Sequence, residues 1–190
     1  MKNIYLIIGR SGSGKTTLTE MLAKEHGLKT VWSYTTRPPR YEGEEGHIFV
    51  SEDEFDCLGE MCAYTEYGGY RYGVTSEIID NSDLYVIDPP GVLYLKDRYK
   101  GSKGLITVFL DISRDICRQR MEARGDDPEV VQKRLDMDEG WFDSSKFGFD
   151  IDLTIRDGYW PESWTLKPWS PETLSRYIWE NICYREGIRE

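Results

Sequence analysis

Residues 9–17 have the sequence Gly9-Arg10-Ser11-Gly12-Ser13-Gly14-Lys15-Thr16-Thr17, which matches the phosphate-loop pattern G-x-x-x-x-G-K-[ST] at every required position. Before the loop, residues 3–8 form a short apolar, β-branched run that is typical of a strand buried on both faces. After it, residues 16–26 repeat apolar side chains at helical spacing, and Gly27 stands where a helix commonly ends. This order of strand, loop and helix favours a nucleotide-phosphate site over the alternative, a glycine-rich turn with one exposed lysine.

The chemistry of such a loop assigns a task to each of its parts. Its glycines let consecutive backbone N–H groups converge on phosphate oxygens, and the N-terminus of the following helix adds roughly half a positive charge. Lys15 is placed to contact the β- and γ-phosphates, and Thr16 offers its hydroxyl to a phosphate-bound Mg²⁺. The predicted phosphate-binding residues are Gly9, Ser11, Gly12, Ser13, Gly14, Lys15, Thr16 and Thr17, with Mg²⁺ as the cofactor at Thr16.

Composition limits the class of protein. A chain of 190 residues can form one large domain with a substantial core. Its net charge of −10 argues against a nucleic-acid binder, so any bound anion needs a local cluster of arginines. No apolar run approaches the ~18 residues of a membrane span. We therefore expect a cytoplasmic protein with no membrane partner, and we expect buried or free thiols at Cys57, Cys62, Cys117 and Cys183, which show no C-x-x-C pair.

The rest of the chain alternates strand and helix patterns, which predicts an α/β fold with a parallel central sheet. Further strands are expected at about 30–35, 82–88, 105–110 and 151–155, and further helices at about 92–99, 113–123, 128–140 and 172–187.

Arginines recur at positions where they can meet phosphate. The prolines at 38 and 39 exclude a helix, so Arg37 and Arg40 are presented by a stiff loop. Arg120 and Arg124 are four residues apart and project from one face of a predicted helix. Taken alone, each of these arginines, and Arg134 on the next helix, is more readily explained as a solvated surface charge. Further motifs follow the phosphate loop in a fixed order: Ser33-Tyr-Thr-Thr-Arg37-Pro-Pro-Arg40, Gly46-His-Ile-Phe49-Val-Ser, Gly69-Tyr-Arg-Tyr72-Gly73, Ile87-Asp88-Pro-Pro-Gly91, Arg120-Met-Glu-Ala-Arg124-Gly125 and Lys133-Arg134-Leu135.

Over roughly residues 1–157, this ordered set resembles the guanylate kinase family, and its departures are those expected of a divergent member. The resemblance implies a three-layer P-loop α/β fold with a parallel central sheet, a small mixed β insertion for the acceptor nucleotide and a helical lid. As a single domain over residues 1–190, it would have its core at about 1–35, 83–120 and 141–190, its insertion at about 36–82 and its lid at about 121–140.

The resemblance also implies an activity, the transfer of the γ-phosphate of Mg-ATP to GMP or dGMP by a monomer or homodimer. The phosphate-loop residues would bind ATP, and no side-chain nucleophile is needed because positioning and charge stabilisation suffice. Lys15, Arg120, Arg124 and Arg134 would be the catalytic groups. The acceptor nucleotide would be bound by Ser33, Arg37, Arg40, His47, Tyr72 and Asp88, with Ser33 and Asp88 facing its base.

Several positions depart from the family. His47 lies where a tyrosine usually contacts the acceptor phosphate. Ala63 replaces the glutamate that reads guanine, and Val74 replaces a hydroxyl residue expected to face the base. Glu66 is a candidate substitute, although a shift of three residues along a strand reverses the face. Near the donor base, Arg156-Asp157-Gly158 stands in place of an Asn-Asp pair, and the Trp-rich segment 159–169 has no equivalent; it would cover the core or form a partner surface.

These departures leave alternatives open. One is a kinase with altered or relaxed base specificity, and another is a non-catalytic guanylate kinase-like interaction module. The intact phosphate loop and lid arginines argue against the module, and a signalling GTPase is disfavoured because the chain lacks the Asn-Lys-x-Asp element.

Overall fold

The computed structural model describes residues 1–39, 41–67, 69–142, 147–156 and 170–188. Its centre is a parallel sheet with the strand order β6-β1-β7-β8. Strand β1 lies between β6 and β7, and its residues from Ile4 to Gly9 are buried, which explains the continuous apolar run that precedes the phosphate loop. The strands span Asn3–Gly9 (β1), Leu84–Val86 (β6), Gly104–Asp111 (β7) and Leu153–Arg156 (β8).

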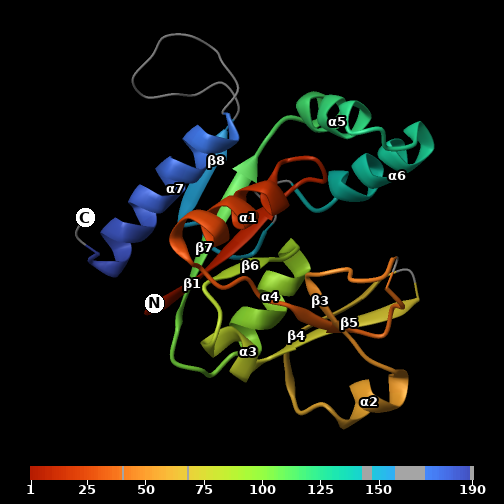
Figure 1. Cartoon of the computed structure of the whole chain (residues 1–190), viewed down its shortest axis with the longest axis vertical. Coiled ribbons are helices and arrows are strands. Elements are labelled where there is room, and N and C mark those ends of the chain that lie inside the picture. Colours follow the sequence, from red (N-terminus) through yellow and green to blue (C-terminus); the bar gives the residue numbers. More distant parts are fainter. Residues whose placement is uncertain (40, 68, 143–146, 157–169, 189–190) are drawn as a thin grey trace.

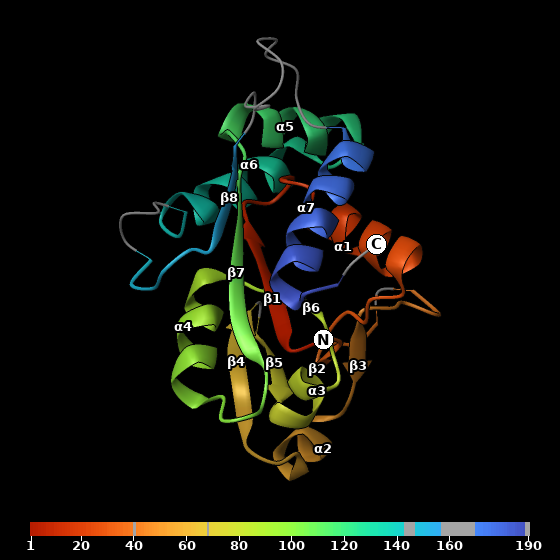
Figure 2. The ribbon, with the colours of Figure 1, turned by 90° about the vertical axis from the view of Figure 1, so that its left-hand side faces the viewer.

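Helices cover both faces of this sheet, as Figure 2 shows. Helices α1 (Lys15–His26) and α7 (Pro171–Glu186) lie together on one face, and α4 (Pro89–Arg98) lies on the other. Along β1, Tyr5 and Ile7 belong to one buried cluster, while Ile4, Leu6 and Ile8 belong to the other. The expected three-layer α/β fold is confirmed.

A second, mixed sheet lies below the first in Figure 1 and has the order β3-β2-β5-β4. Its strands are β2 (Ser33–Thr35), β3 (His47–Phe49), β4 (Met61–Tyr67) and β5 (Tyr70–Thr75). Strand β3 pairs in parallel with β2, and β5 runs antiparallel to both β2 and β4. Two short helices complete this part, α2 (Glu52–Cys57) and α3 (Ser76–Asp80).

The second sheet begins earlier than the expected insertion. Residues 30–35 were expected to form one strand of the core, but Thr30 makes only an isolated bridge to Leu84 and the chain then enters the second sheet at Ser33. The division of the chain into core, insertion and lid stays a prediction, and this pairing favours an insertion that starts at Ser33.

Two helices lie beyond the carboxyl ends of the central strands (Figure 1), and the expected lid, residues 121–140, corresponds to the second of them and the end of the first. These are α5 (Arg114–Ala123) and α6 (Pro128–Glu139). The reversal between them passes through Gly125, whose φ of +88° favours glycine, and α6 then begins at the N-cap Asp127. In the described part of the chain, no helix has the length and apolar character needed to cross a membrane.

Candidate active site

The phosphate loop connects β1 to α1 through conformations that require glycine. Gly12 and Gly14 have φ values of +80° and +98°, and Gly14 is the N-cap of α1. A Cβ on Gly12 would lie 2.5 Å from the carbonyl oxygen of Cys117 on α5. The loop therefore packs closely against α5, and it ends at the N-terminus of α1.

Lys15 lies inside this loop. Its Nζ donates to the carbonyl oxygens of Gly9 at 2.6 Å and Arg10 at 2.9 Å. Burial lowers the pKa of Lys15 to about 8, although the nearby charge of Asp138 opposes that shift. The lysine is thus a poorly hydrated cation held at the point where phosphates would enter.

Asp138, at the end of α6, is a site residue that the sequence analysis missed. Its carboxylate accepts a hydrogen bond of 2.7 Å from the backbone N–H of Ser11, and the residue is only 7% exposed. Arg10 makes a second link to the same region, because its guanidinium donates to the carbonyl oxygen of Phe142 at 3.1 Å. The chain returning from α6 therefore holds the outer part of the phosphate loop.

The predicted catalytic arginines lie on or near α5. Arg120 donates to the carbonyl oxygen of Ser13 at 3.0 Å, and Arg124 makes a forked pair with Asp126 that includes a 2.9 Å bond from its Nε. Arg134 lies 3.5 Å from the same Asp126 carboxylate. One acid thus holds two of the three arginines close together.

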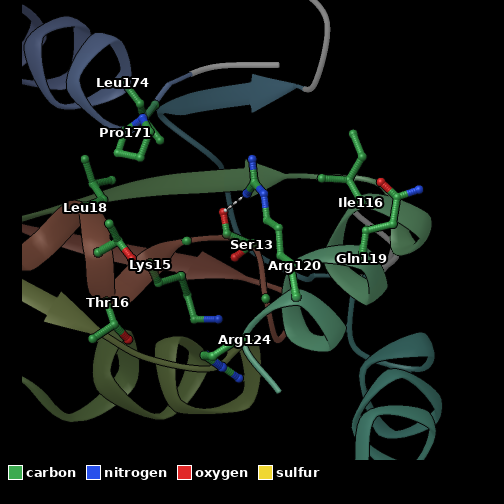
Figure 3. A pocket seen from close by; sticks show the side chains of 14 residues that line it. Ser13, Lys15, Thr16, Leu18, Ile116, Gln119, Arg120, Arg124, Pro171 and Leu174 are labelled. Carbon is green, nitrogen blue, oxygen red and sulfur yellow. Dashed lines mark hydrogen bonds between the residues drawn. The ribbon is translucent and has the colours of Figure 1, made fainter. Parts of the chain in front are cut away.

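A cavity of about 700 Å³ joins the phosphate loop to α5 and to the first turn of α7. Figure 3 shows Lys15, Arg120 and Arg124 around it, with Thr16 beside Lys15. Of the predicted phosphate-loop residues, those from Gly12 to Thr17 line the cavity. Sequence analysis missed the less polar end of this cavity, which is formed by Leu18, Ile116, Gln119, Ala123, Pro171 and Leu174.

A second cavity, of about 160 Å³, lies between the two sheets. Ser33 Oγ and His47 Nδ1 are 2.9 Å apart, and the His47 ring lies edge-on to Tyr72 with 5.7 Å between ring centroids. Asp88 caps α4 by accepting from the Gly91 N–H at 2.6 Å, and burial raises the pKa of its carboxyl group. The predicted acceptor residues Ser33, His47, Tyr72 and Asp88 all line this cavity.

Arg37 is held beside this cavity by Glu44, which the sequence analysis did not single out. The two side chains form a paired contact of 2.8 and 3.2 Å. This hydrogen-bonded carboxylate, together with Tyr72, raises the pKa of Arg37 although burial opposes it. Arg37 is 9% exposed, and its Nε is a buried donor with no hydrogen-bond partner among the described residues. A buried, unsatisfied guanidinium N–H is suited to an anionic ligand.

A family model described as guanylate kinase matches residues 1–153 of this chain. The chain belongs to the guanylate kinase family. It is 37% identical over 147 residues to a guanylate kinase from Neisseria meningitidis serogroup A, covering 70% of each protein. It is also 31% identical over 139 residues to a ribose 1,5-bisphosphate phosphokinase PhnN from Thiobacillus denitrificans, covering 66% of this chain and 70% of that protein.

A crystal structure of guanylate kinase from Anaplasma phagocytophilum superposes with a TM-score of 0.54 at 20% identity, covering 98% of this chain and 87% of that one. This likeness supports the fold. The resemblance inferred from the ordered motifs is confirmed by the family match and the identity to curated relatives.

Within the guanylate kinase frame, the departures at the acceptor site have physical consequences. Ala63 and Val74 are both buried, and because their side chains are hydrocarbon, neither brings a hydrogen-bonding group to the cavity between the sheets. Glu66 is exposed and accepts from the Tyr64 hydroxyl, and it does not line that cavity. Instead, a residue that the sequence analysis passed over, Tyr85 of β6, lines it.

Some predicted features lie outside the described residues. These are Arg40 of the acceptor set, Asp157 and Gly158 of the segment near the donor base, and the Trp-rich stretch 159–169. Arg156, the first residue of that donor-side segment, lies in β8 and forms a 3.2 Å ion pair with Asp111.

Proposed function

We propose that this member of the guanylate kinase family transfers the γ-phosphoryl group of Mg-ATP to GMP or dGMP, giving ADP and GDP or dGDP. The observation that carries the proposal is the register of two adjacent parallel strands. Ile7 of β1 pairs with Val86 of β6, so the phosphate loop starting at Gly9 leaves the sheet beside Asp88 of the acceptor cavity. Ligands of open α/β sheets bind at these carboxyl ends.

Each cationic group has a role in this reaction. Lys15 and Arg120 line the larger cavity and would neutralise the transferring phosphoryl group. Arg124 and Arg134 would exchange their Asp126 partner for phosphate oxygens when α5 and α6 close, which would also exclude water from the reaction. No covalent intermediate is required, because in-line positioning and charge stabilisation are enough.

Mg²⁺ is expected to enter with ATP. This ion usually keeps several waters and takes only one or two protein ligands besides the phosphates. The site fits that preference, since Thr16 lines the cavity next to Lys15 while the described residues contain no group of three acids, histidines or cysteines that could hold a metal alone. The bound ion would neutralise charge on the β- and γ-phosphates.

At the acceptor end, Arg37, Arg40, His47 and Tyr72 would hold the monophosphate. The unsatisfied Nε of Arg37 and the hydrogen-bonded pair of Ser33 and His47 support this assignment. Ser33 and Asp88 would face the base. The oligomeric state, monomer or homodimer, remains part of the proposal.

The test is a coupled assay of ADP release with Mg-ATP and a panel of acceptors: GMP, dGMP, IMP, AMP and ribose 1,5-bisphosphate. We expect GMP and dGMP to give the highest kcat/KM. The second candidate is a sugar-phosphate kinase, because Ala63 brings no carboxylate for a base and one relative is named a ribose 1,5-bisphosphate phosphokinase. A higher kcat/KM with ribose 1,5-bisphosphate than with GMP would favour it. No ADP release with any acceptor would favour a non-catalytic module.

A further inference from the structure

Tyr85 is a tyrosine with a buried ring whose hydroxyl makes no hydrogen bond with any described residue. The residue sits in the middle of β6, is 9% exposed and lines the acceptor cavity. Within the described part of the chain, no hydrogen bond involves its hydroxyl, and this hydroxyl is not among the fully buried polar atoms left without a partner, so it is open to the cavity. A tyrosine with a buried ring usually places its hydroxyl where a partner or solvent can reach it. A cavity-lining hydroxyl without a partner is suited to a ligand.

The surroundings of Tyr85 determine whether its hydroxyl would donate or accept a hydrogen bond. Burial, and after it the charge of Asp88, raise the pKa of Tyr85 above the usual value for a tyrosine, so the phenol keeps its proton and can donate. Asp88 accepts from the Gly91 N–H through one oxygen, and as a carboxylate its other oxygen can only accept. The cavity therefore presents a hydroxyl donor and a carboxylate acceptor.

We infer that Tyr85 is a specificity-determining residue, donating to the 6-oxo group of the acceptor base while Asp88 accepts from the ring N1–H. This inference rests on the proposed function. Guanine and hypoxanthine both carry O6 and N1–H, whereas adenine carries an amino group and an unprotonated N1. Ala63 has no polar side-chain atom to bind the 2-amino group of guanine. The site therefore selects 6-oxopurine monophosphates and distinguishes poorly between GMP and IMP.

The test compares wild type with Tyr85→Phe in steady-state assays at saturating Mg-ATP, with GMP, IMP and AMP as acceptors. Wild type should use GMP and IMP with kcat/KM values within about threefold, and AMP at least about tenfold less well. In Tyr85→Phe, the KM for GMP and for IMP should rise roughly 3- to 10-fold, the scale of one neutral hydrogen bond, while kcat, the KM for ATP and kcat/KM for AMP stay unchanged.

Thermal unfolding supplies a second readout, with Tyr5→Phe as the matched control. Tyr5 is also a buried residue, but its hydroxyl donates to Glu186 at 3.0 Å, and neither residue lines the cavity. Tyr5→Phe should lower Tm and keep the wild-type preference among bases. Tyr85→Phe should keep or raise Tm, because its hydroxyl has no internal partner to lose.

Two results overturn the inference while sparing the proposed function. One is a GMP-to-AMP preference in Tyr85→Phe equal to that of a GMP-active wild type. The other is a fall in Tm with an equal loss for all three acceptors, which would make Tyr85 a purely structural residue. A wild type that prefers GMP to IMP by about a hundredfold would show that the site does bind the 2-amino group of guanine, which contradicts the inference. A wild type that turns over none of the three would overturn both proposals.

Discussion

Replacing Asp138 by asparagine removes one negative charge beside the phosphate loop and keeps the size of the side chain. The 2.7 Å bond from the Ser11 N–H to the carboxylate becomes a neutral bond, which weakens it by about 1 kcal/mol. The charge of Asp138 also supports protonation of Lys15, whose pKa burial has already lowered to about 8. In Asp138→Asn that pKa should fall further, so less of the free enzyme would carry the cationic lysine that we propose binds ATP.

The two effects act in the same direction near pH 8. We expect kcat/KM for ATP to fall roughly 5- to 10-fold there, corresponding to about 1–1.4 kcal/mol. Because kcat/KM reports groups of the free enzyme, the wild-type value should decline as pH rises through about 8, and the decline should begin at lower pH in the variant. At pH 6.5 the loss should be smaller, since Lys15 is then protonated in both proteins.

The assay is a pH series of kcat/KM for ATP at saturating acceptor, for wild type, Asp138→Asn and Asp136→Asn. Asp136 is the matched control, because it lies on the same helix but is exposed and pairs with Arg114 at 2.7 Å. Its replacement should leave the profile unchanged. A profile for Asp138→Asn that superposes on wild type, or a loss of the same size at every pH, would refute the coupling between Asp138 and Lys15.

Three further predictions concern single positions. Lys15→Ala should abolish phosphoryl transfer while circular dichroism shows an intact fold, and near-normal turnover by the folded variant would refute the mechanism. Arg37→Ala should raise the KM for the acceptor far more than the KM for ATP; the reverse pattern would show that Arg37 does not bind the acceptor phosphate. Ala63→Glu should increase the preference for GMP over AMP and IMP by roughly 1–3 kcal/mol. Ala63→Gln is the uncharged control, and an equal gain with glutamine would exclude a role for the charge.

Local pattern was enough to predict the core of the fold. The phosphate loop, its flanking strand and helix, and the later strands depend on residues adjacent in sequence, so β1, α1, β7 and α6 lie close to their expected positions. The strand at Ser33 was assigned to the wrong sheet for a physical reason. It has three residues, and a segment that short carries no pattern that distinguishes one sheet from another.

The site residues that the sequence analysis missed are ones whose function depends on strand pairing or on tertiary packing. Tyr85 belongs to a strand buried on both faces, where alternation does not reveal which side a residue faces. Asp138 did leave a signal. Val131 and Leu135 are buried on α6, and Asp138 follows three residues later on the same stripe, so an acid stands at a core-facing position. An acid buried in this way requires a partner, which is the N–H of Ser11.

The distribution of carboxylates explains how an acidic chain keeps cations ready for phosphate. Among the described residues, Asp126 holds Arg124 and Arg134, and Glu44 holds Arg37. Each carboxylate fixes a long, flexible side chain in place and so lowers the entropy lost when a ligand binds. At the lid, a nucleotide phosphate would replace the Asp126 carboxylate on these arginines. The affinity for phosphate would therefore depend on how much more strongly the arginines bind phosphate than the carboxylate. A net charge of −10 is therefore compatible with a phosphate site, because the attraction is local and does not depend on the overall field.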